Sequence, residues 1–310
     1  MNHKKNPLRG IIVPLVTPLL SNNQLDISGL KKLIERAIKG DVSAIFILGT
    51  TGEAQHLSYE IRKELVKETC EIVRSRVPVL VGISDTSIEE SAGLAAYAAK
   101  CGAEAVVATP PYYFTPSQEE LVKYYSALAS KLELPLYLYN MPSNVKINIE
   151  PQTAVELSKN PKIIGLKDSS ANGVYFQKML YFFKNKPFTL VVGPEEMTAE
   201  TVMLGGHGGV NGGANIYPKL YTELYKAAVN RDFETIEKLQ QIVMEISTTY
   251  YSVGNNPSSY FRGLKAILEL KGICSGVLAE PYFEFGKKEK EALKSGIKSI
   301  EKKLSEVGIY

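Results

Sequence analysis

The 310-residue sequence contains no tryptophan, only three cysteines and only three histidines, and these shortages exclude several kinds of site. Cys70, Cys101 and Cys274 lie far apart and form no CxxC pair. Zinc sites and disulfide frameworks need closely spaced Cys and His residues. We therefore expect no bound metal, reduced thiols and a cytoplasmic location.

The chain also lacks a strong charge imbalance and a long apolar run. Lys and Arg total 36 against 33 for Asp and Glu, and the basic residues are interspersed with acidic ones. Nucleic-acid-binding surfaces carry clustered basic residues instead. The apolar stretch after Arg9 is interrupted by Pro14 and Pro18, whereas a membrane helix needs about 20 apolar residues. We therefore expect no nucleic-acid or membrane partner and no signal peptide.

Short apolar, β-branched runs are abundant, and stretches with helical periodicity lie between them. They repeat at roughly the length of a βαβ unit. Strands that read as continuous apolar runs and alternate with helices indicate a parallel sheet covered on its outer face. The eight runs are Gly10–Pro18, Ser43–Thr50, Pro78–Ser84, Ala103–Pro110, Pro135–Pro142, Ile163–Ser169, Thr189–Glu195 and Gly208–Asn215.

Eight such units predict a closed (β/α)8 TIM barrel, and the sequence after Tyr217 reads as helices only. We predict helices over 218–230, 232–251, 258–271 and 287–307. The first of these closes the barrel, so we assign residues 1–230 to the barrel and 231–310 to a C-terminal helical extension packed on it. Barrels with modest extensions reach this length.

Lys167 is the candidate nucleophile. It ends the run IIGLK, and a lysine is unusual in a wall that should be buried. Barrel enzymes place their sites at the C-terminal ends of the strands. Burial favours the neutral amine over the ammonium, and a neutral amine can attack a carbonyl carbon. A salt bridge to the adjacent Asp168 is the alternative that this residue alone leaves open.

Other strand ends carry groups that fit such chemistry. The turn Gly49–Gly52 contains Thr50 and Thr51, whose hydroxyl and N–H groups suit a small carboxylate. It lacks the GK[ST] ending of a nucleotide-binding loop. Tyr139 ends the fifth run and Tyr113 follows the fourth, so a phenol can relay protons beside the amine. Thr/Gly turns and strand tyrosines are also common as purely structural features.

The glycine-rich segment Gly205–Gly213 covers the eighth run and allows two interpretations. One is a phosphate cradle of the kind that barrels form near their last strands. The other is close approach of a ligand or a neighbouring backbone. Because the segment contains no Lys or Arg, we favour the second interpretation.

Together these motifs resemble the dihydrodipicolinate synthase and N-acetylneuraminate lyase family, through roughly Leu8 to Phe285. Gly49–Glu53, Tyr139–Pro142 and Gly165–Asp168 follow one another in the order and spacing of that family. The resemblance implies a class I pyruvate-dependent aldolase or lyase that needs no cofactor beyond a covalent imine. It also implies a homo-oligomer, a dimer or tetramer.

The resemblance assigns roles to individual positions. Lys167 matches the imine-forming lysine and Tyr139 the proton-transferring tyrosine, while Thr50 and Tyr113 match the rest of the proton relay. Tyr113 would reach in from a neighbouring subunit. Thr50 and Thr51 match the carboxylate pocket, and Val210 matches the backbone that lies along pyruvate.

The second substrate is where the sequence departs from the synthase pattern. Asn144 stands where the synthases carry an arginine that binds the aldehyde's carboxylate, and an amide cannot replace a guanidinium. Glu195 and Glu196 lie where sialic-acid lyases bind sugar hydroxyls. In contrast to those lyases, the loop after Pro142 is shorter.

Three functions follow in order of preference. The first is a lyase for a 2-keto-3-deoxy sugar acid, which would yield pyruvate and an aldehyde. The second is a 4-hydroxy-tetrahydrodipicolinate synthase that condenses pyruvate with aspartate semialdehyde, with Lys146 or another residue replacing the missing arginine. The third is a non-catalytic keto-acid-binding protein, which the intact set of Lys167, Tyr139, Thr50 and Tyr113 disfavours.

Overall fold

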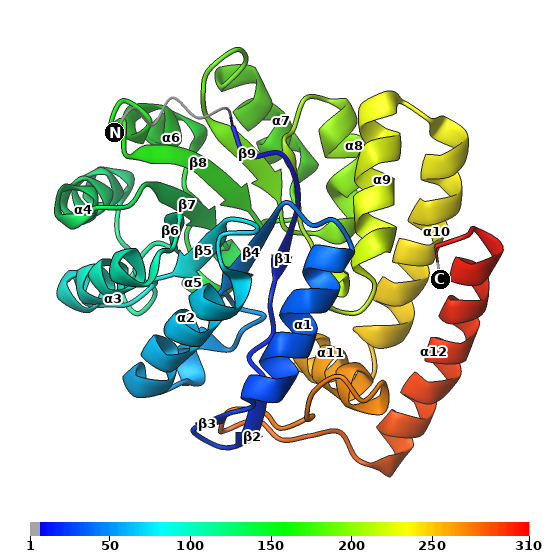
Figure 1. Ribbon diagram of the computed structural model, residues 1–310. Coiled ribbons are helices and arrows are strands. Elements are labelled where there is room, and N and C mark those ends of the chain that lie inside the picture. Colours follow the sequence, from blue (N-terminus) through cyan, green and yellow to red (C-terminus); the bar gives the residue numbers. More distant parts are fainter. Residues whose placement is uncertain (1–6, 310) are drawn as a thin grey trace.

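The computed structural model describes residues 7–309, and its centre is a closed barrel of eight parallel strands (Figure 1). Neighbouring barrel strands follow one another along the chain, with a separate two-stranded hairpin inserted after the first, and the last strand pairs with the first through Gly10 and Gly208. The predicted fold is therefore confirmed. The strands are Gly10–Pro14 (β1), Ala44–Ile47 (β4), Val79–Gly82 (β5), Ala105–Ala108 (β6), Leu136–Asn140 (β7), Ile163–Asp168 (β8), Thr189–Val192 (β9) and Gly208–Val210 (β10).

Helices between the strands cover the outside of the barrel (Figure 1). Side-chain caps fix where several of them begin: the Ser117 hydroxyl accepts from the N–H of Glu120, and the Glu120 carboxylate accepts from the N–H of Ser117. The helices are Ile27–Lys39 (α1), Tyr59–Val73 (α2), Ile88–Cys101 (α3), Gln118–Lys131 (α4), Pro142–Val145 (α5), Pro151–Leu157 (α6), Gly173–Phe182 (α7), Thr198–Met203 (α8) and Pro218–Asn230 (α9).

Side chains inside the barrel form a core separate from the one between strands and helices. Both faces of every strand are covered, which is why each strand reads as an unbroken apolar run. The inner core contains Ile12, Ala44, Phe46, Leu80, Ala105, Val107, Tyr137, Tyr139, Val191 and Val210. Lys167 pairs in register with Tyr139 on one side and Val191 on the other. Its side chain therefore belongs to the inner face.

The glycines of the eighth strand and its following turn mark places where atoms approach closely. A Cβ atom on Gly208, whose φ is +154°, would lie 1.8 Å from the carbonyl oxygen of Gly10. A Cβ on Gly212 would lie 1.8 Å from the hydroxyl of Tyr260. Close packing thus accounts for this segment, as its lack of basic residues indicated.

Three further helices, Phe233–Tyr250 (α10), Ser259–Leu270 (α11) and Lys287–Glu306 (α12), follow the barrel. α10 packs against α9, and α12 packs against both α10 and α11 (Figure 1). Between α11 and α12 the chain returns to the loops at the end of the barrel, where Ser275 donates to the carbonyl of Leu19 in the hairpin strand Leu19–Ser21 (β2). The other hairpin strand is Gln24–Leu25 (β3). The predicted division at residue 230 stays a prediction.

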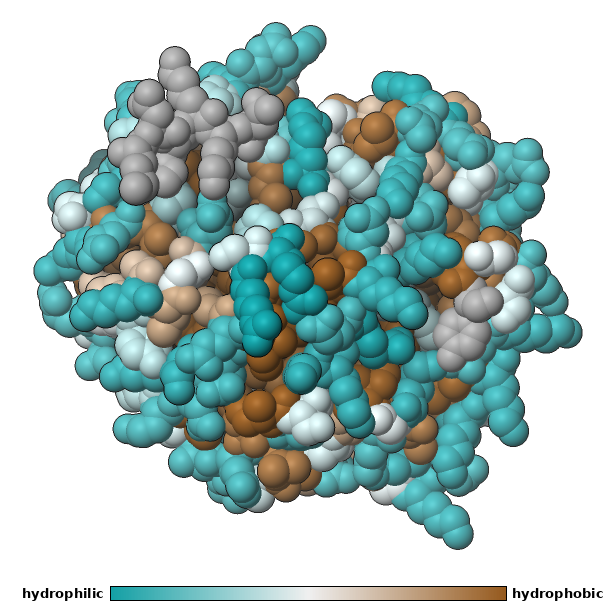
Figure 2. All heavy atoms as spheres, in the orientation of Figure 1, coloured by the Kyte–Doolittle hydropathy of each residue, from teal (hydrophilic) through white to brown (hydrophobic). Residues whose placement is uncertain are grey.

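The surface agrees with the mixed charge and the lack of a long apolar run in the sequence. Figure 2 shows hydrophilic side chains over most of the face in view, with hydrophobic ones in patches between them. Within residues 7–309, no helix has both the length and the hydropathy that crossing a membrane requires. The part of the signal-peptide prediction that concerns residues 1–6 lies outside the described residues.

Candidate active site

Lys167 lies at the end of β8 with only 7% of its surface exposed. Its Nζ is 3.9 Å from the ring centroid of Tyr139 and 5.4 Å from that of Phe46. In the described chain it has no carboxylate partner. Asp168 is instead hydrogen-bonded to Asn140, at 2.8 Å, and to Ser170. The Lys167–Asp168 salt bridge that the sequence left open is therefore not formed.

Tyr139 connects the amine to the loop after β4. Its hydroxyl lies 3.2 Å from the hydroxyl of Thr50, and it also hydrogen-bonds to Lys167 and Ser169. Burial opposes ionisation of the phenol, but the charge of Lys167 and these hydrogen bonds outweigh burial, so the pKa of Tyr139 is lowered. A phenol with a lowered pKa beside an amine is suited to proton transfer.

The segment Gly49–Glu53 forms a tight turn whose two threonines face different partners. Thr51 shares a 3.1 Å hydrogen bond with the hydroxyl of Tyr260, which extends from α11. Backbone bonds from Gly52 to Gly49 and from Glu53 to Thr50 close the turn. Among residues 7–309, neither the backbone N–H of Thr50 nor that of Thr51 donates a hydrogen bond to a backbone carbonyl in this turn. Two N–H groups and a nearby hydroxyl can therefore bind an anion.

Val210 and Tyr113 occupy opposite extremes of exposure. Val210 ends β10 and, with Ile12, Phe46, Leu80, Val107, Tyr137 and Val191, lines a small cavity that also borders Lys167. Tyr113 follows β6, is 81% exposed and contacts the ring of Phe114 rather than the other predicted site residues. Within one chain, the structure thus brings Lys167, Tyr139, Thr50 and Val210 together and leaves Tyr113 outside.

The residues assigned to the second substrate differ in how far their polar groups are already bonded. Asn144 is exposed on the short helix α5, and its side chain accepts from Ser143. Glu195 is 3% exposed and accepts from Tyr221 at 2.5 Å, Tyr251 at 2.8 Å and the N–H of Gly213 at 2.8 Å.

Glu195 and Glu196 begin a 3₁₀ turn, Glu195–Met197, that faces the helical extension. Burial is the main cause that raises the pKa of Glu195 to about 7, against hydrogen bonds that lower it. Glu196 accepts from Ser247, and its carbonyl accepts from Gln240 at 2.7 Å. Protein groups therefore occupy hydrogen-bonding positions on both carboxylates.

Sequence reasoning missed two contributions of α11. Tyr260 bonds to Thr51, and Lys265 forms a 2.5 Å ion pair with Glu53. A signal for the second was present, because Lys265 interrupts the otherwise apolar stretch of a helix that is buried over most of its length. No group of three His, Cys, Asp or Glu side chains in residues 7–309 is arranged to hold a metal ion.

Comparison with known proteins places this geometry in a family context. A model described as the dihydrodipicolinate synthetase family matches residues 7–300. A 4-hydroxy-tetrahydrodipicolinate synthase from Methanocaldococcus jannaschii is 30% identical over 293 residues, which cover 94% of this chain and 98% of that protein.

Solved structures agree. A structure described as dihydrodipicolinate synthase from Bacteroides thetaiotaomicron is 53% identical, with a TM-score of 0.93, and the match covers 95% of this chain and 99% of that one. A prophage protein of the same family from Escherichia coli K12, solved in complex with pyruvate, is 28% identical with a TM-score of 0.89, covering 94% and 98% of the two chains.

Proposed function

We propose, from the premise that this chain belongs to the dihydrodipicolinate synthetase family, that it condenses pyruvate with aspartate semialdehyde through an imine on Lys167. Membership makes it a class I pyruvate-dependent aldolase, whose chemistry proceeds through a lysine imine rather than an external cofactor. The choice of aldehyde and the residue roles are the parts proposed here.

Lys167 is the nucleophile. Its neutral amine adds to the keto carbon of pyruvate, and loss of one water from the carbinolamine leaves the imine. Removal of a methyl proton gives an enamine whose carbon attacks the aldehyde, and water finally releases the product from the lysine. Tyr139, in contact with both Lys167 and Thr50, transfers the protons that enter and leave the carbinolamine oxygen.

The turn Gly49–Glu53 binds the pyruvate carboxylate. The N–H groups of Thr50 and Thr51 and the hydroxyl of Thr51 supply donors. Val210 forms the wall opposite, because it borders the same cavity as Lys167. This arrangement holds the keto carbon beside the amine and orients the methyl group for deprotonation.

Tyr113 completes the relay only in an oligomer. In the single chain its ring is solvent-exposed and contacts Phe114 rather than Thr50 or Tyr139. We therefore place Tyr113 across a subunit interface of a homodimer or homotetramer, where a second copy would insert it into the site of the first.

Support for aspartate semialdehyde comes from the relatives and from the residues assigned to the second substrate. The curated relatives carry the synthase name. Glu195 and Glu196, the basis for a sugar-acid substrate, are already hydrogen-bonded to protein groups. Lys146, directly after α5, is exposed, and in this proposal its ammonium binds the aldehyde's carboxylate in place of the missing arginine.

One observation favours the second candidate, a lyase for a 2-keto-3-deoxy sugar acid. The exposed Asn144 is neutral; the resemblance matches it to the synthase arginine, and a polyhydroxylated aldehyde does not require a cation there. Both candidates share the imine and differ only in the aldehyde.

The observation that carries the proposal is the buried Lys167, without a carboxylate partner in the described chain, against the ring of Tyr139. The test combines two measurements. Borohydride reduction in the presence of pyruvate should add the mass of the reduced adduct to the peptide that contains Lys167. Condensation assays with aspartate semialdehyde, N-acetylmannosamine and glyceraldehyde should then show the highest kcat/KM with the first. An unmodified Lys167 contradicts the mechanism, whereas preference for a sugar aldehyde overturns only the substrate assignment.

A further inference from the structure

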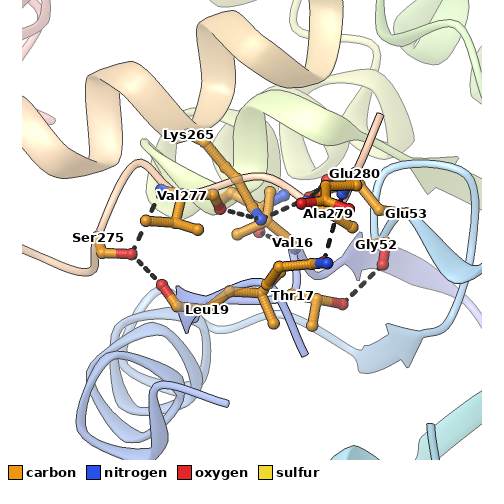
Figure 3. Close-up of polar contacts among 12 residues, drawn as sticks. Val16, Thr17, Leu19, Gly52, Glu53, Lys265, Ser275, Val277, Ala279 and Glu280 are labelled. Carbon is orange, nitrogen blue, oxygen red and sulfur yellow. Dashed lines mark hydrogen bonds and ion pairs between the residues drawn. The ribbon is translucent and has the colours of Figure 1, made fainter. Parts of the chain in front are cut away.

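The buried ion pair between Glu53 and Lys265 joins the turn Gly49–Glu53 to the helical extension. The Lys265 side chain is 1% exposed and so is that of Glu53, and their charged atoms are 2.5 Å apart. Figure 3 shows Lys265 extending from α11 between Glu53 and the segment that carries Val277 and Ala279. Elements more than 200 residues apart thus meet at a single carboxylate.

Each residue of this pair also has one partner outside the pair. Lys265 donates to the carbonyl of Val277 at 2.6 Å, and the other Glu53 oxygen accepts from the N–H of Ala279 at 2.9 Å. Glu53 itself adopts a left-handed conformation with a φ of +56°. A non-glycine residue keeps that conformation only where its surroundings hold it. The pair therefore fixes the backbone at the end of the turn that contains Thr50 and Thr51.

α11 holds the same turn at a second point. Tyr260, five residues before Lys265, shares a hydrogen bond with the Thr51 hydroxyl. The ring of Tyr260 is itself packed edge to face against Tyr251, with centroids 4.8 Å apart, and Tyr251 donates to Glu195. One helix thus contacts both the middle and the end of the turn.

A contribution to the stability of the fold does not by itself explain why this buried ion pair is present. Moving two charges out of water costs free energy that their attraction often only offsets, and apolar residues of similar volume frequently stabilise a core as well. What apolar residues cannot supply is a directional contact that fixes one backbone conformation. The location of the pair at the end of Gly49–Glu53 is therefore the informative feature.

We propose that Glu53 and Lys265 are positioning residues, which clamp the turn Gly49–Glu53 to α11 and thereby hold Thr50 and Thr51 in the geometry that binds the keto-acid carboxylate. The inference deepens the proposed function and rests on it for the identity of the ligand. The helical extension is then a working part of the site, although it contributes neither the nucleophile nor the proton relay.

Two variants and one control test the clamp. Lys265→Met removes the cation, and Glu53→Gln/Lys265→Met restores neutrality in the core while keeping an acceptor for Ala279. Lys271→Met is the control, because Lys271 follows the same helix but pairs with Glu301 on α12. For each, we would measure the melting temperature, the pyruvate concentration that half-saturates borohydride trapping, and hydrogen exchange of the amides in Gly49–Ala54.

The clamp predicts a distinct pattern across these readouts. Lys265→Met should raise the half-saturating pyruvate concentration by about 10- to 100-fold, the loss expected for a charge-assisted contact, and should speed exchange in Gly49–Ala54. The neutral double variant should recover melting temperature but retain the weakened pyruvate binding. Lys271→Met should lower the melting temperature without changing pyruvate half-saturation.

Wild-type pyruvate binding and unchanged exchange in both clamp variants, assayed below their melting temperatures, would overturn the proposal. If Lys265→Met does not fold, the double variant supplies the same two readouts. A wild-type protein that forms no pyruvate adduct would refute the proposed function instead, and the exchange measurement would still decide whether the pair holds the turn.

Discussion

Two lysines in this molecule are buried to a similar degree and have opposite surroundings. Lys167 faces the rings of Tyr139 and Phe46 with no carboxylate beside it in the described chain. Lys265, in the helical extension, is enclosed by Glu53 and the carbonyl of Val277. Burial lowers the pKa of Lys265, and Glu53 opposes that shift. Burial alone therefore does not make a lysine reactive, because Glu53 and the carbonyl of Val277 occupy the amino group of Lys265, whereas no carboxylate in the described chain occupies that of Lys167.

Replacing the two lysines separately is the strongest way to break this comparison. Lys167→Ala should abolish the borohydride-trapped adduct and reduce turnover by at least about 10³-fold, because the other buried lysine among the described residues, Lys265, is paired with Glu53. Its melting temperature should stay close to that of the wild type. Trapping on another lysine would show that the unpaired environment is not what selects Lys167.

Removal of the phenol beside Lys167 should have the next largest effect. Tyr139→Phe keeps the ring and removes the hydroxyl that bonds to Thr50, so turnover should fall by roughly 10² to 10⁴-fold, the range typical of acid–base assistance. Steady-state kinetics with pyruvate and the preferred aldehyde, together with circular dichroism, would separate this loss from unfolding. Unchanged turnover would leave Tyr139 as a packing residue.

Lys146 provides a third, exposed lysine for the comparison. Lys146→Ala should raise the KM for aspartate semialdehyde by about 10-fold, because a carboxylate loses a charge-assisted contact, and should leave pyruvate half-saturation unchanged. Asn144→Arg should lower that KM, and Lys146→Arg serves as the charge-preserving control. If Lys146→Ala behaves as wild type, the aldehyde's carboxylate binds elsewhere or is absent from the substrate.

Tyr260→Phe tests the second contact that the helical extension, which carries Lys265, makes with the turn Gly49–Glu53. The substitution removes one neutral hydrogen bond to Thr51, so pyruvate half-saturation should rise by about 2- to 10-fold while kcat changes little. Isothermal titration of pyruvate with the variant would check this directly. A fall in kcat without weaker binding would assign the hydroxyl to chemistry rather than to positioning.

Glu195→Gln extends the comparison to a buried acid and should affect turnover least. Burial raises the pKa of Glu195 to about 7 from 4.5, so the folded protein keeps a proton that the unfolded chain has released. The resulting stability is fully present below about pH 4.5 and is lost as the pH rises through about 7.

Urea unfolding of wild type and Glu195→Gln at several pH values would measure this difference. The free energy of unfolding of the wild type should fall relative to the variant by up to about 3 kcal/mol across that interval. If the free energies of unfolding of the two proteins change in parallel with pH, the proton taken up on folding is not bound to Glu195 but elsewhere in the cluster of Glu195, Tyr221 and Tyr251.

The sequence predicts the barrel, and the proximity of Lys167, Tyr139 and Thr50 within it, for a local reason. Each strand is a short apolar run, and strand ends converge in a barrel, so Lys167, Tyr139 and Thr50 could be placed together from their positions in such runs. The four C-terminal helices were predicted to within one or two residues because their apolar periodicity is local as well.

The remaining features depend on side-chain direction and on distant segments. Glu195 was predicted to face a substrate, yet its partners Tyr221 and Tyr251 come from 26 and 56 residues away. Neither the spacing of these residues nor their type indicates that contact. Lys265 signalled its burial through the apolar sequence around it, but the sequence did not identify Glu53 as its partner.

The contact between Ala279 and Glu53 also has a consequence for biosynthesis. These residues are 226 positions apart, so the turn that begins the site leaves the ribosome long before the segment that completes it. The ribosome synthesises a chain from its N-terminal end at about 5–20 residues per second. If Glu53 and Lys265 clamp the turn as proposed, a nascent chain holds Thr50 and Thr51 in their binding geometry only after Lys265 and Ala279 have been translated.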